Sequence, residues 1–133
     1  PPAITATILD LPMGYVRSGH KDHGRQNQIE GKMEPGTKVV VIEDLISTGG
    51  SVLEVVDVLR QAGAQVLGIA SIFTYGLQKG VERLAAADVV NYSLSDFDTL
   101  SKVAAAEGYI ADKDIAKLTA FQKNPQDPAW MEL

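Results

Sequence analysis

Residues 39–51 read VVVIEDLISTGGS and combine an apolar run, two acids and a loop of small residues. The first four residues, Val39–Ile42, are typical of a strand that is covered on both faces of a parallel sheet. Two carboxylates, Glu43 and Asp44, follow directly. Residues 45–51 are rich in Ser, Thr and Gly and lead into a helical pattern. The stretch therefore predicts a strand, a loop and a helix in succession.

The rest of the chain alternates between strand and helix patterns. Besides residues 39–42, expected strands cover residues 13–17, 65–75 and 89–94. Expected helices cover residues 51–64 with Gly63 as the stop, 78–87, a segment that starts at Ser95 with Asp98 in a capping box, and 112–123. Residues 18–36 are polar and glycine-rich, and we expect them to form a long loop. This order predicts an α/β fold of right-handed βαβ units, with a parallel sheet flanked by helices.

Each expected helix has an apolar face at helical spacing, which we expect to face the core. These faces comprise Val52, Val55, Val56 and Leu59; Val81, Leu84 and Ala85; Leu100, Val103 and Ala104; and Ile115 and Leu118.

Composition limits the classes of function. The net charge of −5 argues against general binding to nucleic acid or to a membrane surface. The chain has no cysteine, which excludes disulfides and thiolate zinc sites and is consistent with a cytoplasmic protein. An acidic protein can still bind an anion if it concentrates its donors locally.

The strand-to-helix loop predicts such an anion site. In an open parallel sheet, ligands bind beyond the carboxyl ends of the strands. The first amides of a helix have no partner within the helix, and the helix dipole adds positive charge there. Gly49 and Gly50 let the backbone approach an oxygen-rich ligand closely, and Ser47, Thr48 and Ser51 add hydroxyl donors. We expect this loop to hold a phosphate.

The two acids need a different partner, because carboxylates repel phosphate. A ribose fits: its hydroxyls donate hydrogen bonds to Glu43 and Asp44, and its anomeric carbon becomes positive if the leaving group departs early. A plain capped turn is the alternative interpretation of STGGS taken alone. Adjacent acids at the end of a core strand are costly to desolvate and seldom structural. They therefore favour a phosphorylated ribose.

Residues 17–25 read RSGHKDHGR and gather cations and both histidines of the chain. We expect Arg17 and Lys21 to neutralise an anionic group that leaves the ribose and His23 to donate a hydrogen bond or a proton. A mobile loop here would close over the site and exclude water. One alternative is a loop that is merely solvated. Another is a metal site formed by His20 and His23. The flanking glycines and the lack of a third ligand argue against the metal site.

Two motifs together resemble a known family. Residues 39–51 match the phosphoribosyl pyrophosphate (PRPP) motif of type I phosphoribosyltransferases at every position. The pattern Arg17-x-x-x-Lys21-Asp22-His23-Gly24 resembles the flexible loop of orotate phosphoribosyltransferases, and the stretches IFTYGLQKG and SLSDFDTL are similar to their Gram-positive branch. The resemblance implies a type I phosphoribosyltransferase-like fold and transfer of phosphoribose from PRPP to orotate, with Mg²⁺. It also implies a homodimer in which each loop serves the neighbouring subunit's site.

The resemblance further implies roles for matching residues. Lys21, His23 and Asp44 would be catalytic, and Arg17 would join Lys21 and His23 on pyrophosphate. Glu43 and Asp44 would hold the ribose hydroxyls, and Mg²⁺ would be held mainly by substrate and water. The remaining substrate-binding positions are Leu45, Ile46, Ser47, Thr48, Gly49, Gly50 and Ser51, of which the last five would wrap the 5′-phosphate.

Three features depart from the family pattern. Ser18 stands where many members have a lysine, and residues 73–76 lack the arginine with which some members grip orotate. We expect residues 1–133 to be a single core domain without the N-terminal segment that hoods the base. Two alternatives to the orotate transferase function are a transferase for uracil or a purine, and a regulatory module that binds PRPP without catalysis.

Overall fold

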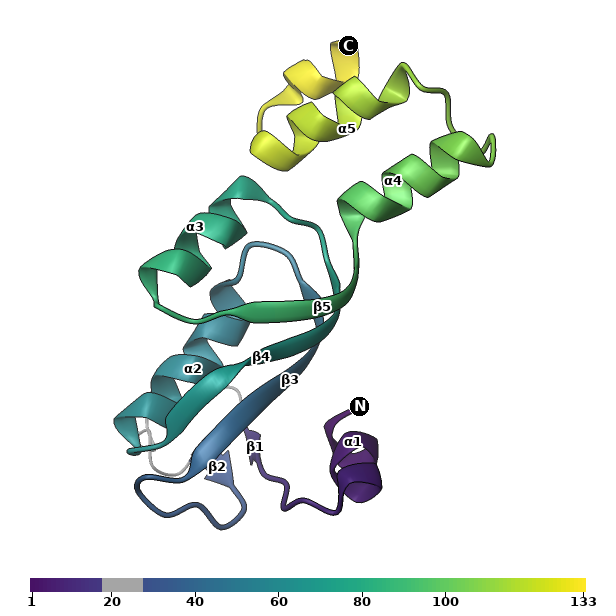
Figure 1. The fold of residues 1–133 in the computed structure, drawn as a ribbon. Coiled ribbons are helices and arrows are strands. Elements are labelled where there is room, and N and C mark those ends of the chain that lie inside the picture. The colour runs from purple at the N-terminus through teal and green to yellow at the C-terminus, as the bar shows by residue number, and fades with distance from the viewer. Residues whose placement is uncertain (18–27) are drawn as a thin grey trace.

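The computed structural model describes residues 1–17 and 28–133. Along the chain the elements are α1 (Pro2–Leu9), β1 (Tyr15–Val16), β2 (Ile29–Glu30), β3 (Lys38–Ile46), α2 (Gly50–Gln61), β4 (Gln65–Thr74), α3 (Gln78–Ala86), β5 (Asn91–Asp96), α4 (Phe97–Ala106), α5 (Asp114–Lys123) and the 3-10 helix η2 (Pro128–Glu132), as Figure 1 shows. None of the helices among these residues is long and apolar enough to span a bilayer.

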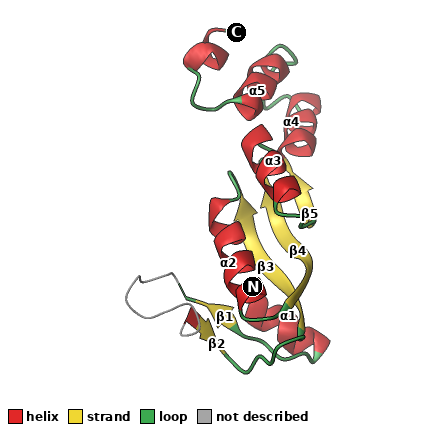
Figure 2. Ribbon diagram, turned by 90° about the vertical axis from the view of Figure 1, so that its left-hand side faces the viewer, coloured by secondary structure: helices red, strands yellow, loops and turns green. Residues whose placement is uncertain are grey.

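The central sheet is parallel, with strand order β3-β4-β5, which confirms the α/β prediction. Helix α2 connects β3 to β4, and α3 connects β4 to β5. The two helices contact each other on the same side of the sheet (Figures 1 and 2). A separate antiparallel pair, β1-β2, packs Val16 and Ile29 against the edge of the core.

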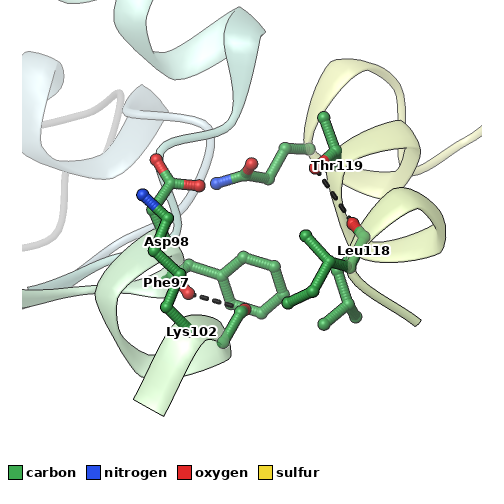
Figure 3. Close-up of a pocket in the computed structure, with 8 residues that line it drawn as sticks. Phe97, Asp98, Lys102, Leu118 and Thr119 are labelled. Carbon is green, nitrogen blue, oxygen red and sulfur yellow. Dashed lines mark hydrogen bonds between the residues drawn. The ribbon is translucent and has the colours of Figure 1, made fainter. Parts of the chain in front are cut away.

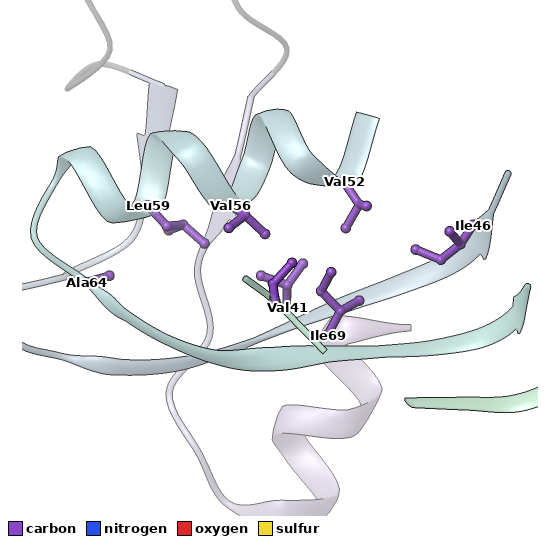
Figure 4. Packing of buried hydrophobic residues seen from close by; sticks show 8 residues of the cluster. Val41, Ile46, Val52, Val56, Leu59, Ala64 and Ile69 are labelled. Atoms are coloured by element: carbon purple, nitrogen blue, oxygen red, sulfur yellow. The ribbon is translucent and has the colours of Figure 1, made fainter. Parts of the chain in front are cut away.

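The core lies between this sheet and α2 (Figure 4). Val52, Val56 and Leu59 form the inner stripe of α2, as their spacing predicts. They meet Val41 of β3 and Ile69 of β4, and Ile69 has no exposed surface. Gly63 has a φ of 93° directly after α2, which confirms it as the helix stop.

The opposite face of the sheet is apolar but exposed. Because side chains alternate along a strand, Val40, Ile72, Tyr92 and Leu94 point away from α2 and α3. Leu94 is 87% exposed and Tyr92 70%. The expectation of a strand buried on both faces is therefore wrong for the described residues, because helices cover only one side.

The strand at residues 39–42 is longer than predicted. β3 runs from Lys38 to Ile46, so the two acids lie inside the strand rather than after it. The reason is the pairing with β4: Glu43 lies opposite Ser71, and Ile46 lies opposite Thr74. Polarity alone does not end a strand whose backbone has a partner.

The N-terminal region contains two elements that the sequence pattern did not predict. α1 forms at Pro2–Leu9 with none of its residues buried. β2 lies within the segment that we expected to be a long loop, and its residues Ile29 and Glu30 pair with Val16 and Tyr15. Such a two-residue strand is too short to leave a periodic signal and is specified only by its partner.

The helices after β4 are rotated relative to the predicted faces. Val81 is 58% exposed on α3, and Ala85 is exposed as well, while Gly80 is buried. On α4, Leu100 and Val103 are exposed and Ser101 is buried. Each helix turns toward a contact that the chain pattern does not encode: the loop after β3 for α3, and aromatic side chains for α4.

The helix cap predicted at Ser95 is one residue too early. β5 continues through Ser95, which pairs with Phe73, and ends at Asp96. The Asp96 carboxylate caps α4 by accepting hydrogen bonds from the Thr99 amide (2.8 Å) and the Thr99 hydroxyl (3.1 Å). These bonds to the charged form lower the pKa of Asp96.

Candidate active site

The last residues of β3 hold the two adjacent acids. Glu43 is half-buried and Asp44 is exposed. The Asp44 amide donates to Glu43 Oε1 at 3.0 Å, and the Leu45 amide donates to Asp44 Oδ1 at 2.7 Å. These contacts hold both carboxyl groups close to the backbone at the carboxyl end of the strand.

The local environments of the two acids shift their pKa values in opposite directions. Burial raises the pKa of Glu43, and the contact with the neighbouring Asp44 carboxyl adds to the rise. The same contact lowers the pKa of Asp44, with help from the Leu45 amide. As the pH falls, Glu43 therefore takes up the first proton and Asp44 stays anionic longer.

The loop after β3 leads directly into α2. Gly49 is the N-cap residue, with a φ of 83°, and no side chain caps the helix. Ser47, Gly50 and Ser51 are exposed, and Thr48 is half-buried. Among the described residues, no hydrogen-bond partner is found for the amides of Thr48 and Gly49. The predicted loop thus presents free donors at a helix N-terminus, where a bound anion is favoured.

The two residues before this loop differ in exposure. Ile46 is 2% exposed and belongs to the core, so its side chain points away from solvent. Its carbonyl accepts a hydrogen bond from the Tyr75 amide at 3.1 Å. Leu45 is 45% exposed beside it. Position 46 therefore anchors the loop to β4, whereas position 45 is accessible.

Of the predicted cationic residues, the structure describes Arg17. Its Nε lies 3.0 Å from Glu30 Oε1, and its backbone amide donates to the Gln28 carbonyl at 2.7 Å. The ion pair fixes Arg17 at the end of the β1-β2 hairpin. Lys21 and His23, with the alternative metal pair of His20 and His23, lie outside the described residues.

Helix α3 contributes two residues to this region that sequence reasoning missed. A Cβ added to Gly80 would lie 2.6 Å from the Ser47 carbonyl oxygen, so the helix touches the loop backbone. Arg83 Nη1 donates to the Thr48 carbonyl at 3.4 Å. A glycine inside an otherwise helical pattern was the available signal for the first contact. Nothing in the pattern distinguishes Arg83 from a surface arginine.

The described residues hold no ready-made metal cage beside the loop. Groups of three potential His, Asp or Glu ligands are absent from residues 1–17 and 28–133. A small pocket between α4 and α5 is lined in part by Phe97, Asp98, Lys102, Leu118 and Thr119 (Figure 3). None of the predicted site residues lines this pocket.

Comparison with known proteins decides the family. The family model described as "Phosphoribosyl transferase domain" matches residues 3–103, which is most of the chain. The chain belongs to the phosphoribosyltransferase family. This assignment confirms the resemblance that the PRPP motif at residues 39–51 implied.

Relatives of this phosphoribosyltransferase include orotate enzymes. The chain is 58% identical over 123 residues to an orotate phosphoribosyltransferase of Bacillus cytotoxicus, and the match covers 92% of the chain and 59% of the relative. The chain thus spans about three fifths of the length of the curated relatives that it matches.

Solved structures agree on the fold. A crystal structure of orotate phosphoribosyltransferase from Aeropyrum pernix superposes with a TM-score of 0.67 at 32% identity, over 82% of this chain and 59% of that one. A second, from Mycobacterium tuberculosis in complex with PRPP, has a TM-score of 0.55 at 26% identity, over 65% of this chain and 48% of that one.

Proposed function

We propose that this phosphoribosyltransferase transfers phosphoribose from PRPP to orotate, giving orotidine 5′-monophosphate and pyrophosphate. The observation that carries the proposal is that the unpartnered amides of Thr48 and Gly49 follow the acids Glu43 and Asp44 at the same strand end. The 58% identity to a curated orotate phosphoribosyltransferase supports the choice of base.

In this reaction the loop holds the substrate and the acids favour the transition state. The bond between ribose C1 and the pyrophosphate oxygen breaks as a bond forms from C1 to a ring nitrogen of orotate, whose N–H proton is released to water. Positive charge develops at C1 as pyrophosphate leaves. Asp44, whose lowered pKa keeps it anionic, stabilises that charge, and Glu43 accepts hydrogen bonds from the ribose hydroxyls.

The leaving pyrophosphate needs cations. We assign this role to Arg17 and Lys21, with His23 as the donor of a hydrogen bond or a proton. Arg17 is already held by Glu30 at 3.0 Å, which would fix its direction before the substrate arrives. We further propose that Leu45 lies against the substrate and that Ser47 lies near the base.

Magnesium is the proposed cofactor. The carboxylate oxygens of Glu43 and Asp44 are the ligand type that Mg²⁺ prefers, and the ion usually keeps several waters and substrate oxygens. It would supply neutralising charge for pyrophosphate. The lack of cysteine fits the reducing cytoplasm, where we place this step of pyrimidine synthesis.

A measurement of pyrophosphate release tests the reaction. The chain is mixed with PRPP and Mg²⁺, and orotate, uracil or a purine is added in turn. Release with orotate alone is the expected result. Release with another base would reassign the substrate, and calorimetric binding of PRPP without turnover on any base would indicate a regulatory module instead.

We also propose a homodimer in which the loop with Lys21 serves the neighbouring subunit's site. Mixing a Lys21→Ala protein with an Asp44→Asn protein should then restore part of the activity, because one of the two sites in a mixed dimer would hold both intact residues. Each variant alone is the control. A mixture with no recovered activity would show that every site is built from one subunit.

A further inference from the structure

The loop after β3 rests on helix α3 at two points. At the first, Gly80 faces the Ser47 carbonyl so closely that an added Cβ would be 2.6 Å from its oxygen and 3.5 Å from the Thr48 carbonyl carbon. At the second, the Arg83 guanidinium donates to the Thr48 carbonyl at 3.4 Å. Both carbonyls of the loop therefore point toward α3.

Because the peptide bond is planar, the direction of each carbonyl fixes the direction of the amide that follows it. In a trans peptide the C=O and the following N–H point in opposite directions. The Ser47 carbonyl shares its peptide with the Thr48 amide, and the Thr48 carbonyl shares its peptide with the Gly49 amide. Since the carbonyls point toward α3, both amides point away from it. Successive amides that point to the same side of a loop can bind an anion there.

The position of Arg83 has a second, electrostatic consequence. A Cβ on Gly50, the first residue of α2, would lie 3.5 Å from Arg83 Nη1. A cation beside the positive end of a helix dipole is unfavourable in the empty protein. A bound phosphate on the other side of the loop would relieve that repulsion, so Arg83 makes binding of an anion more favourable without touching it.

We propose that α3 is the backing of the phosphate loop, with Gly80 and Arg83 as positioning residues for the 5′-phosphate of a phosphorylated ribose. Gly80 lets the helix come close enough to fix the Ser47 peptide, and Arg83 fixes the Thr48 peptide and raises the local positive potential. This inference rests on the proposed function, since it presumes that residues 47–51 hold the 5′-phosphate.

Arg60 provides a matched control within the same pair of helices. Its guanidinium donates to the carbonyls of Ala87 at 2.5 Å and Asp88 at 2.9 Å, just after the end of α3. It thus performs the same carbonyl-binding task as Arg83 but away from the loop. Removing Arg60 should weaken the packing of α2 and α3 without changing the orientation of the loop amides.

The test compares the affinities of two probes, ribose 5-phosphate and pyrophosphate, by calorimetry. Arg83→Ala should weaken ribose 5-phosphate binding about tenfold, the equivalent of one lost hydrogen bond, and leave pyrophosphate affinity unchanged. Arg83→Lys should restore most of the loss, because it keeps a charged donor. Arg60→Ala should leave both affinities unchanged. Gly80→Ala should also weaken ribose 5-phosphate alone, because the loop backbone must move.

The outcomes separate this inference from the function on which it rests. If the parent chain binds ribose 5-phosphate and Arg83→Ala binds it equally well, the positioning role is wrong and the proposed function stands. Equal loss of both probes in Arg83→Ala would also overturn it, because that result indicates general damage. If the parent chain binds neither probe, the proposed function itself fails, and this inference fails with it.

Discussion

The junction from β3 to α2 and the junction from β4 to α3 begin alike. Each follows a strand of the same parallel sheet, contains a glycine with positive φ, and starts a helix without a side-chain cap. Gly49 has a φ of 83° in the first, and Gly76 has a φ of 63° in the second. Their backbone designs are therefore closely related.

The second junction is filled by the protein's own groups. The Gly76 amide donates to the Thr74 hydroxyl at 3.3 Å, and the Tyr75 carbonyl accepts from Gln122 Nε2 at 2.9 Å. Leu77, at the N-cap of α3, is 6% exposed. At the first junction the amides of Thr48 and Gly49 have no hydrogen-bond partner among the described residues. The same local geometry is thus filled by internal hydrogen bonds in one case and left available for the proposed ligand in the other, depending on which groups reach it from elsewhere.

A line of aromatic contacts explains how the second junction is filled. Phe73, Tyr75, Phe97, Phe121 and Trp130 follow one another with ring centroids 5.3 to 6.1 Å apart. The line joins the end of β4 to α4, α5 and η2, and it brings Gln122 of α5 to the Tyr75 carbonyl. The C-terminal helices therefore close the junction that lies beside the open one.

The largest effect on activity should come from removing the negative charge of Asp44 at the junction from β3 to α2. Asp44→Asn should lower turnover by about 10²-fold, because it removes a negative group that matters most when C1 is positive. Binding of ribose 5-phosphate should change little. Steady-state rates and calorimetry measure the two quantities. Asp57→Asn, on the exposed side of α2, is the control, and an unchanged turnover number for Asp44→Asn would rule out this role.

A matched glycine pair tests the comparison directly. Gly49→Ala and Gly76→Ala should each lower the free energy of unfolding by about 1–2 kcal/mol, because both force alanine into the left-handed region. Only Gly49→Ala should weaken ribose 5-phosphate binding as well. Urea unfolding and calorimetry provide the two readouts. Equal loss of affinity in the two variants would mean that the junctions do not differ in function.

Opening the filled junction should have a smaller effect. Gln122→Ala leaves the half-buried Tyr75 carbonyl without its donor and should lower the free energy of unfolding by about 1 kcal/mol. The near-UV circular dichroism should also change as the aromatic line loosens. Thr119→Ala, a neighbour on α5 whose hydroxyl donates to the Ile115 carbonyl of its own helix, is the control. Equal stability of Gln122→Ala and the parent would show that the hydrogen bond is dispensable.

The smallest expected effect is the dependence of folding stability on pH that Glu43 causes. The pKa of Glu43 is raised above its ordinary 4.5, so the folded protein keeps this proton where the unfolded chain has released it. The contribution of Glu43 to stability therefore falls as the pH rises from 4.5 through the raised pKa. Glu43→Gln should be slightly more stable than the parent at pH 7, and the difference should disappear below pH 4.5.

Melting temperatures measured from pH 4 to 7 check this sign. Asp44 has the opposite sign: its lowered pKa contributes stability above its ordinary 3.8 that is lost as the pH falls. A Glu43→Gln protein that is less stable than the parent at pH 7 would contradict the raised pKa. Its turnover should fall even if its stability rises, since the ribose loses a charged acceptor.

The strands and helices with strong periodicity were predictable, and the weaker contacts were not. The inner stripe of α2, with Val52, Val56 and Leu59, is buried as expected, because one helix face and one sheet face decide it locally. The predicted face of α3 was wrong at Val81, because Gly80 packs against Ser47, which lies 33 residues earlier in the chain. The positions of α1 and β2 were missed for a different reason, since each lacks a periodic pattern.

The candidate site divides in the same way. The acids Glu43 and Asp44 and the loop glycines were predicted from one contiguous stretch, because a phosphorylated ribose would require those residue types side by side. The supporting contacts of Arg83 and Gln122 come from other elements and leave no mark in the local pattern.

By itself, the sequence determined that this protein has a parallel α/β sheet and a small-residue loop next to two acids, since periodicity and motif spacing are properties of neighbouring residues. Only the tertiary structure decided that β3 extends through the acids, that one sheet face stays exposed, and that α3 lies behind the loop. Those outcomes depend on strand pairing and on helix packing between segments far apart in the chain, where steric fit and hydrogen-bond partners, rather than local preference, set the arrangement.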